Sequence, residues 1–346
     1  LFLLGIALRI NSHNLCAIIL RFNIRKLKRI KYNKKNLKKI LIFSKSGGNE
    51  DIKESFQNYE NNNIIFYWIP RSFLKKIFFY HFKGKQYKDY YTKISHSKEI
   101  NKKRFYVKFL TSTFISLNNF LKLDGFISFN LFYYAEKHFD EVCLNLNKKF
   151  IIFHKESTFT PIEEIGASRV YKNHNDKTLS HKISVYSEIQ KKILIKSKIA
   201  NKNQVIVNGC PRSDYAFRLR KIKPKKNIIV YYMIESKRGS DLVSNKFNIN
   251  WVKLYNQTLR YLIEYAKINS DVKIIIKGKT GIHKRNHFSL KYLPANCTFI
   301  EGGTGEKLLQ DAKVVIAFNS TIVLEAIAGN RNLVIPNFNN EKTTKK

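Results

Sequence analysis

The stretch DAKVVIAFNSTIVLEAIAGNRNLVIP, residues 311–336, decides the fold class. Its apolar run VVIAF, residues 314–318, has no polar alternation, as expected for a parallel strand covered on both faces. Three favoured N-cap residues follow, Asn319, Ser320 and Thr321, and then a helical segment that ends at Gly329 before the apolar LVIP. The stretch therefore predicts one compact βαβ unit.

A helix that starts at the carboxyl end of a parallel strand points free backbone N–H groups into the crevice where open α/β sheets bind ligands. Phosphate groups commonly bind at such helix N-termini. Thr321 and Glu325 lie four residues apart on one helix face, so the Glu325 carboxylate can accept hydrogen bonds from sugar hydroxyls beside the phosphate. An alternative remains open, in which Ser320 only caps the helix and Glu325 is a solvated helix residue.

Composition indicates a globular chain of two ordinary domains, because it has 346 residues of which 44% are hydrophobic. The net charge of +39 would suggest nucleic acid as a partner. However, the charge is spread along the chain, and the abundance of Lys, Asn, Ile, Phe and Tyr is the bias expected from an AT-rich genome. We therefore expect a generic basic surface with no specific nucleic acid partner, and some attraction to an anionic membrane face.

The four cysteines, Cys16, Cys143, Cys210 and Cys297, have no paired spacing, which argues against a zinc site or a disulfide framework and fits a reducing cytoplasm. The apolar start LFLLGIAL is broken by Arg9 and is too short to span a bilayer. We expect it to be a buried strand or helix piece. The chain is expected to be cytoplasmic, with peripheral contact at the inner face of the plasma membrane.

Strand and helix patterns alternate along most of the chain, which is typical of an α/β protein. The charged, proline-containing linker RKIKPKKN, residues 220–227, suggests a domain boundary. We predict two Rossmann-like lobes that face a central cleft, an acceptor-side lobe over residues 1–222 and a nucleotide-donor lobe over residues 223–346.

Three segments carry a resemblance to known families. VNGCPRSDYAF, residues 207–217, resembles the Gly-x-Pro-Arg-x-Asp turn of surface-carbohydrate and CDP-glycerol glycerophosphotransferase families. Residues 308–336 resemble the donor-site block of GT-B glycosyltransferases and their capsule-biosynthesis relatives. FHKESTFTP, residues 153–161, is similar to the matching N-lobe loop of the same surface-polysaccharide proteins.

The resemblance implies that Asn319, Ser320 and Thr321 contact the donor diphosphate and that Glu325 contacts the ribose or sugar hydroxyls. CDP-glycerol transferases usually carry an aspartate and a tyrosine before paired serines, where this chain has AFNST. This departure favours a sugar nucleotide over a CDP-polyol as the donor.

Further donor-site candidates lie at other strand ends. Arg212 follows Pro211 in a turn, where its guanidinium can bind a phosphate or form a network with Asp214. Lys277 ends the strand pattern VKIII and can neutralise the leaving diphosphate, although a solvated surface lysine is the alternative. Gly303 and Thr304 lie in the loop EGGTGE, whose glycines allow close approach to a nucleobase or phosphate, or simply make a turn.

His154 is the best candidate for a general base, because it ends a predicted strand in the acceptor lobe and its ordinary pKa is near neutrality. Glu156 lies two residues further, so on a strand both side chains would face the same way and Glu156 could orient or replace His154. The alternative is a hydrogen-bonded structural histidine. No metal is implied, because there is no Asp-x-Asp motif, and no cofactor is expected beyond the nucleotide-activated donor.

These patterns predict a GT-B-like bacterial glycosyltransferase of cell-envelope and capsule polysaccharide synthesis, which transfers a sugar from a nucleotide sugar to a glycan or lipid-linked acceptor. Four rivals remain: a CDP-polyol phosphotransferase of the teichoic-acid type, a sugar-nucleotide 2-epimerase, a non-catalytic polysaccharide-export accessory protein and a nucleic-acid-binding protein. The chain lacks an initiator methionine and stops soon after the last donor-lobe strand, so we expect a fragment with a truncated C-terminal lobe.

Overall fold

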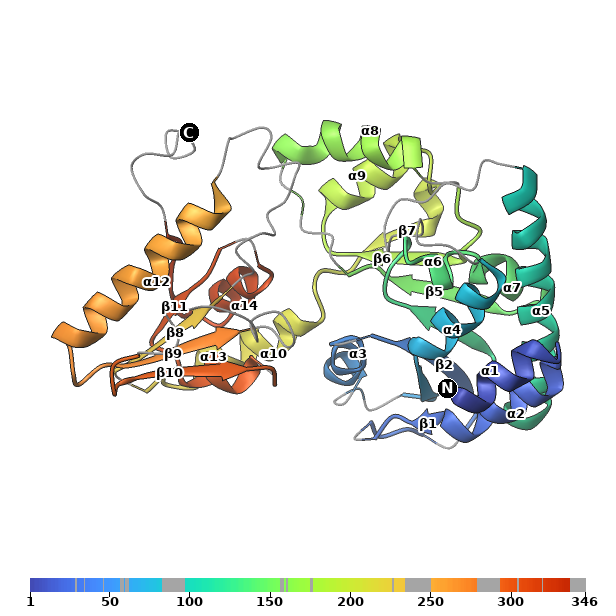
Figure 1. Cartoon of the computed structure of the whole chain (residues 1–346), viewed down its shortest axis with the longest axis horizontal. Coiled ribbons are helices and arrows are strands. Elements are labelled where there is room, and N and C mark those ends of the chain that lie inside the picture. Colours follow the sequence, from blue (N-terminus) through green and yellow to red (C-terminus); the bar gives the residue numbers. More distant parts are fainter. Residues whose placement is uncertain are drawn as a thin grey trace. The chain divides into compact units, whose positions relative to one another are not determined.

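The protein is described by a computed structural model that divides into two compact units, Leu1–Pro211 and Arg212–Lys346, each built around a largely parallel sheet (Figure 1). The structure describes residues 1–28, 30–33, 35–45, 47–56, 59, 62–82, 97–155, 159, 161–174, 177–225, 227–233, 250–278, 293–303, 305–318 and 320–336. The α/β fold predicted from the sequence is confirmed.

The first unit has a seven-stranded sheet in the order β1-β3-β2-β4-β5-β6-β7, in which only β1 is antiparallel to its neighbour. Its strands are β1 (Arg25–Lys26), β2 (Lys38–Ser44), β3 (Ile64–Pro70), β4 (Gly125–Ser128), β5 (Lys149–Phe153), β6 (Lys182–Val185) and β7 (Val205–Val207). The chain runs from β2 outward to β3 and then returns to the other side of β2 to form β4. The carboxyl ends of β2 and β4 therefore form a switch point, where open α/β sheets bind ligands.

Helices cover both faces of this sheet. They are α1 (Phe2–Arg9), α2 (His13–Asn23), α3 (Gly48–Phe56), α4 (Ser72–His81), α5 (Ser97–Leu121), α6 (Tyr134–Lys137), α7 (Phe139–Asn145), α8 (Glu164–His174) and α9 (Glu188–Lys196), with short 3-10 turns η1 (Pro161–Glu163) and η2 (Lys202–Gln204). One core contains side chains from α1, α2, α4, α5 and α7 together with β2, β4 and β5, and a smaller core on the other face contains α3. The N-terminal segment LFLLGIAL, expected to be a strand or a helix piece, lies in helix α1.

Gly48 shows how closely α3 packs against the sheet. A Cβ atom at this position would lie 2.4 Å from the ring of Phe129, which follows β4. Only glycine allows this approach, so the start of α3 lies directly beside the carboxyl end of β4.

The second unit has a five-stranded, fully parallel sheet in the order β10-β9-β8-β11-β12. Its strands are β8 (Ile228–Tyr232), β9 (Lys273–Gly278), β10 (Cys297–Glu301), β11 (Val314–Ile316) and β12 (Asn332–Val334). Helix α12 (Trp251–Ile268) packs on one face, while α10 (Arg212–Arg218), the turn η3 (Leu219–Lys221), α13 (Glu306–Asp311) and α14 (Ile322–Ala328) pack on the other. The βαβ unit predicted over residues 311–336 is confirmed.

Residues 212–222, which the sequence analysis placed in the first lobe, contribute to the core of the second unit. Ala216 and Leu219 are fully buried there among side chains of β8, α13 and α14. The charged residues of the linker that the structure describes are exposed, whereas the apolar residues before it pack on the second sheet.

Candidate functional site

The carboxyl ends of β8 and β11 form the switch point of the second sheet. The chain runs from β8 through β9 to β10 and then returns to the other side of β8 to form β11. In open parallel sheets, ligands bind in the crevice outside such a point. The candidate residues of the second unit are therefore best judged by their distance from these two strand ends.

The start of α14 follows β11 at this edge. Thr321 is the N-cap residue and makes no side-chain cap, while the Ser320 hydroxyl accepts a long hydrogen bond of 3.4 Å from the Ile322 amide. The Glu325 amide donates to the Thr321 carbonyl at 3.3 Å, so these two residues do occupy one helix face. Ser320 is exposed, and Thr321 and Glu325 are partly exposed and accessible to a ligand.

Tyr232, the last residue of β8, is a site residue that the sequence analysis missed. Its hydroxyl donates to the Gly305 carbonyl at 2.7 Å, which ties the loop after β10 to the end of β8. Burial raises the pKa of Tyr232, and the nearby carboxylate of Glu325 raises it further. Ile322 and Ala326 of α14 share one core with Tyr232, so the helix that carries Glu325 packs beside the end of β8.

Lys277 lies beside Tyr232, because the parallel register pairs these two residues across β8 and β9. The Lys277 side chain is buried, and its Nζ donates to the Gly278 carbonyl at 2.9 Å. Burial lowers the pKa of Lys277, while Glu301 on β10 opposes that shift. A partly desolvated ammonium group with one carbonyl partner at a strand end is well suited to bind a phosphate oxygen.

The remaining donor-site candidates are placed less completely. Gly303 is exposed, has a φ of +71°, and has no atom within 4 Å of the position a Cβ would take, so the loop after β10 is open at this point. Arg212 begins α10, and only its backbone is described. Thr304 and Asn319 lie outside the described residues.

In the first unit, β5 ends at Phe153, so His154 directly follows the strand. The expectation that His154 and Glu156 face the same way stays a prediction. His154 is only 1% exposed, and its backbone amide donates to the Ser184 carbonyl at the end of β6. Because β5 lies between β4 and β6, successive amides alternate between the two neighbours, and the Lys155 amide donates to the Phe129 carbonyl just after β4. Glu156 lies outside the described residues.

The His154 ring is held by the segment that follows β4. Its Nδ1 accepts a hydrogen bond of 3.4 Å from the Leu131 amide, and its ring packs edge-on against Phe132 with centroids 5.4 Å apart. With Nδ1 as the acceptor, the neutral ring carries its proton on Nε2. The assignment of His154 as a general base stays a prediction, and this contact with Leu131 is what such a base must give up.

A buried ion pair lies close to the carboxyl end of β3 and was not predicted. Arg71 Nε donates to Glu136 Oε1 at 2.5 Å, and the guanidinium lies 3.8 Å from the ring centre of Tyr133. Burial raises the pKa of Glu136 to about 7, although the charge of Arg71 and its hydrogen bond oppose the shift. The pair fixes α6 against the end of β3.

A second buried pair joins α3 to the end of β5. The Nζ of Lys155 lies 3.3 Å from Asp51 Oδ2, and both side chains are buried. Buried ion pairs thus lie near the carboxyl ends of both β3 and β5.

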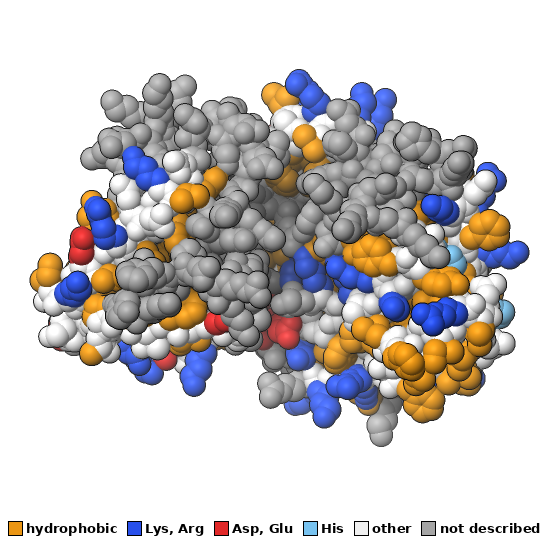
Figure 2. All heavy atoms as spheres, viewed as in Figure 1, with side chains coloured by type: hydrophobic (Ala, Val, Ile, Leu, Met, Phe, Trp, Pro, Cys, Tyr) orange, Lys and Arg blue, Asp and Glu red, His pale blue; other side chains and the backbone are white. Residues whose placement is uncertain are grey.

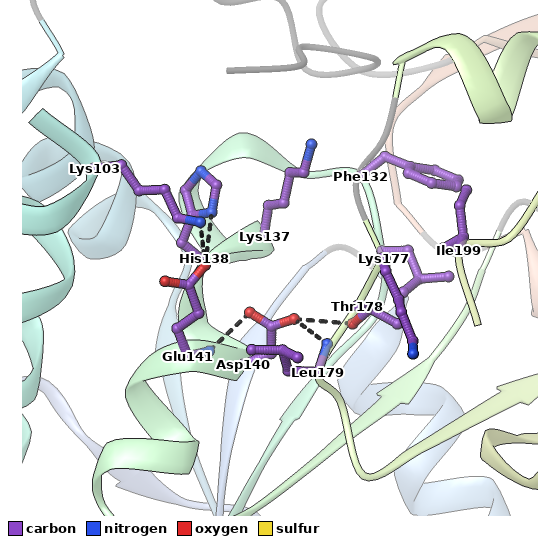
Figure 3. Close-up of a pocket in the computed structure, with 11 residues that line it drawn as sticks. Lys103, Phe132, Lys137, His138, Asp140, Glu141, Lys177, Thr178, Leu179 and Ile199 are labelled. Carbon is purple, nitrogen blue, oxygen red and sulfur yellow. Dashed lines mark hydrogen bonds and ion pairs between the residues drawn. The ribbon is translucent and has the colours of Figure 1, made fainter. Parts of the chain in front are cut away.

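A pocket of about 130 Å³ lies beside Leu131 and Phe132 in the first unit (Figure 3). Asp140 accepts hydrogen bonds from the Leu179 amide at 2.7 Å and the Thr178 hydroxyl at 3.0 Å. Figure 3 shows Glu141 on the opposite side, where it forms an ion pair with Lys103. Both carboxylates of the pocket are therefore engaged by the protein, and Phe132, in its lining, also packs against the His154 ring.

His138, in the wall of this pocket, gives the first unit a specific acid sensitivity. Burial and the charges of Lys103 and Lys137 lower the pKa of His138 to about 3, from an ordinary value of 6.5. Below pH 6.5 the unfolded chain binds a proton that the folded chain does not, so the stability contributed above pH 6.5 is lost as the pH falls toward 3. The free energy of unfolding should fall by up to about 1.4 kcal/mol per pH unit in this window.

We expect His138→Asn to remove this component. The free energy of unfolding, measured by urea titration at several pH values, should depend less steeply on pH between 6.5 and 3 in the variant than in the wild type. His13→Asn, at an exposed histidine of α2, is the matched control. Parallel pH profiles for wild type and His138→Asn would contradict the assignment.

Among the residues that the structure describes, no group of three or more His, Cys, Asp or Glu side chains could hold a metal ion. The described part of the chain also contains no helix that is both long and apolar enough to span a bilayer.

No family model and no curated protein matches this sequence. Among solved structures, the chain is similar to UDP-GlcNAc 2-epimerase from Neisseria meningitidis bound to UDP-GlcNAc, with 15% identity, coverage of 86% of this chain and 81% of that chain, and a TM-score of 0.45. It is similar to HepE from Anabaena in complex with UDP and glucose, with 12% identity, coverage of 86% and 80%, and a TM-score of 0.41.

The wall teichoic acid polymerase TagF is also similar, with 13% identity, coverage of 95% of this chain and 75% of that chain, and a TM-score of 0.41. At these identities and TM-scores the likeness says nothing about what this chain binds or transfers.

Proposed function

We propose that this chain is a GT-B-like glycosyltransferase that binds a nucleotide sugar in its second unit and transfers the sugar to a glycan or lipid-linked acceptor of a surface polysaccharide. The observation that carries the proposal is that Lys277 and Tyr232 are paired at the switch point of a fully parallel sheet. Helix α14, which carries Glu325, shares a core with Tyr232. This arrangement combines a buried cation for phosphate with a carboxylate for hydroxyl groups, which is the pair of functions a nucleotide sugar needs.

In this proposal the donor diphosphate lies between the loop at Gly303 and the start of α14 at Ser320 and Thr321. Lys277 neutralises the negative charge that develops on the departing nucleoside diphosphate. Glu325 accepts hydrogen bonds from the ribose or sugar hydroxyls. Protein cations and backbone N–H groups then supply the electrostatic stabilisation that other transferases take from a metal.

The transfer itself forms one bond and breaks one. An acceptor hydroxyl oxygen attacks the anomeric carbon, the bond from that carbon to the diphosphate oxygen breaks, and the hydroxyl proton passes to a base. We assign the base to His154 or to Glu156, on the acceptor side. Since His154 is buried, it must lose its contact with Leu131 before it can accept the proton.

A nucleotide panel tests the proposal. We expect UDP, GDP, CDP or CMP, or one of their activated sugars, to raise the unfolding temperature of the second unit selectively, by mass action on the folded state. Glu325→Gln should reduce this shift. Glu264→Gln is the matched control, because Glu264 is an exposed carboxylate on α12 of the same unit.

The identity of the stabilising nucleotide separates the rival functions. Stabilisation by CDP or CDP-glycerol alone would replace the proposal with polyol-phosphate transfer. Donor conversion without any acceptor would replace it with epimerisation. A folded chain that none of these nucleotides stabilises would refute the donor site.

A further inference from the structure

Helix α1 exposes apolar residues on the side that faces away from the core. Leu4, Ala7 and Leu8 are fully buried against the first unit. The opposite side of the helix carries Leu3, Ile6 and Ile10, all exposed, and Phe2, which is 81% exposed. A surface helix normally carries polar residues on the side that faces water. An apolar outer face of this kind is typical of an interaction site.

Helix α2 continues the same surface. It buries Cys16, Ala17 and Leu20 completely, yet Ile18 is exposed and Phe22 is 82% exposed. We call the exposed apolar residues of the two helices the α1–α2 face: Leu1, Phe2, Leu3, Ile6, Ile10, Ile18 and Phe22. Figure 2 shows hydrophobic side chains gathered over α1 and α2, with Lys and Arg side chains around them.

Charge in this part of the chain has one sign. Residues 1–49 contain two arginines before residue 25 and ten lysines and arginines from residue 25 onward, twelve in all, and no Asp or Glu. The first acidic residue of the chain is Glu50. Arg9 and Arg21 are exposed on α1 and α2 themselves.

We propose that the α1–α2 face docks on an anionic lipid bilayer. The two helices lie in the plane of the interface, Phe2 and Phe22 enter the boundary between head groups and acyl chains, and the surrounding cations meet the lipid phosphates.

Charge complementarity selects this occupant over the others. A second copy of the chain would bring the exposed Arg9 and Arg21 against cations of the same sign, which opposes self-association through this face. A nucleic acid would satisfy the cations but offers no apolar surface for exposed leucine and isoleucine side chains. A bilayer with anionic head groups offers both. This inference stands whether or not the second unit binds a nucleotide.

Vesicle sedimentation of the full chain tests the inference. We expect binding to vesicles of phosphatidylcholine and phosphatidylglycerol in equal parts, and at least tenfold weaker binding, on the order of 1.4 kcal/mol, to vesicles of phosphatidylcholine alone. The double variant Phe2→Ser, Phe22→Ser should bind the anionic vesicles at least roughly tenfold more weakly. Added salt should weaken binding of the wild type.

The matched control is Phe217→Ser, Ile268→Ser, which removes two exposed apolar side chains from the second unit and should leave vesicle binding unchanged. Because all four residues are exposed, both double variants should keep the wild-type unfolding temperature. The inference is overturned if the Phe2, Phe22 variant binds vesicles as well as the wild type does. It is equally overturned if that variant only abolishes a lipid-free dimer seen in sedimentation equilibrium.

Discussion

Replacing Glu136 by leucine should destabilise the first unit by about 3–5 kcal/mol, the range for breaking one side of a buried ion pair. The substitution removes the carboxylate that accepts from Arg71 Nε and leaves that guanidinium buried opposite an apolar side chain. The expected loss exceeds that of a surface substitution several fold. It can be measured by urea unfolding followed through Trp68 fluorescence.

Trp68 lies on β3 of the first unit and Trp251 begins α12 of the second, and the chain has only these two tryptophans. A Trp251→Phe background therefore reports the first unit alone. In that background, Arg71→Met, Glu136→Leu should recover much of the stability lost in Glu136→Leu, since both charges of this pair are then removed. A double variant that is less stable than Glu136→Leu would show that the two side chains act independently.

Replacing Arg331 by alanine should destabilise the second unit by roughly 3–5 kcal/mol, because it deprives several buried carbonyls of a donor at once. The guanidinium lies just before β12 and is 7% exposed. It donates to the carbonyls of Leu219, Ile222, Leu309, Gln310 and Gly329, at 3.1 to 3.3 Å. One side chain thus joins the segment after α10, the end of α13 and the end of α14.

Arg331→Lys should recover little of this loss. An ammonium group has three donors on one atom and cannot reproduce the planar fork that reaches carbonyls on three sides. Trp251 fluorescence in a Trp68→Phe background measures the second unit. The control is Arg260→Lys, which changes an exposed arginine on α12. Full recovery by lysine would mean that charge, rather than the shape of the guanidinium, holds these segments together.

The sequence predicted most strands because unbroken apolar runs of β-branched residues mark parallel strands. The βαβ unit over residues 311–336 was predicted within a few residues, and its cap residues do precede α14. The strand pattern KFIIFHKES was predicted to run on to Ser157, whereas β5 ends at Phe153.

The side-chain neighbours described in the two units could not be predicted from the sequence, because their members are far apart along the chain. Arg71 and Glu136 are 65 residues apart, and each alone looks like one more exposed charge. Tyr232 and helix α14 share one core only because β8 and β11 are neighbours in the sheet. Sheet order is a tertiary property that local periodicity does not encode.

A titration of nucleotide into the lysine variants of β9 tests the central claim most directly. The claim is that the strand ends of the second unit bind the diphosphate of a nucleotide donor through Lys277. Lys277→Met should weaken binding of the nucleotide selected by the panel at least about tenfold in titration calorimetry, since it removes a partly desolvated charge. Lys273→Met, on the same strand but exposed, should leave the affinity unchanged. Equal affinity in wild type and both variants would contradict the account and move the diphosphate away from the switch point of this sheet.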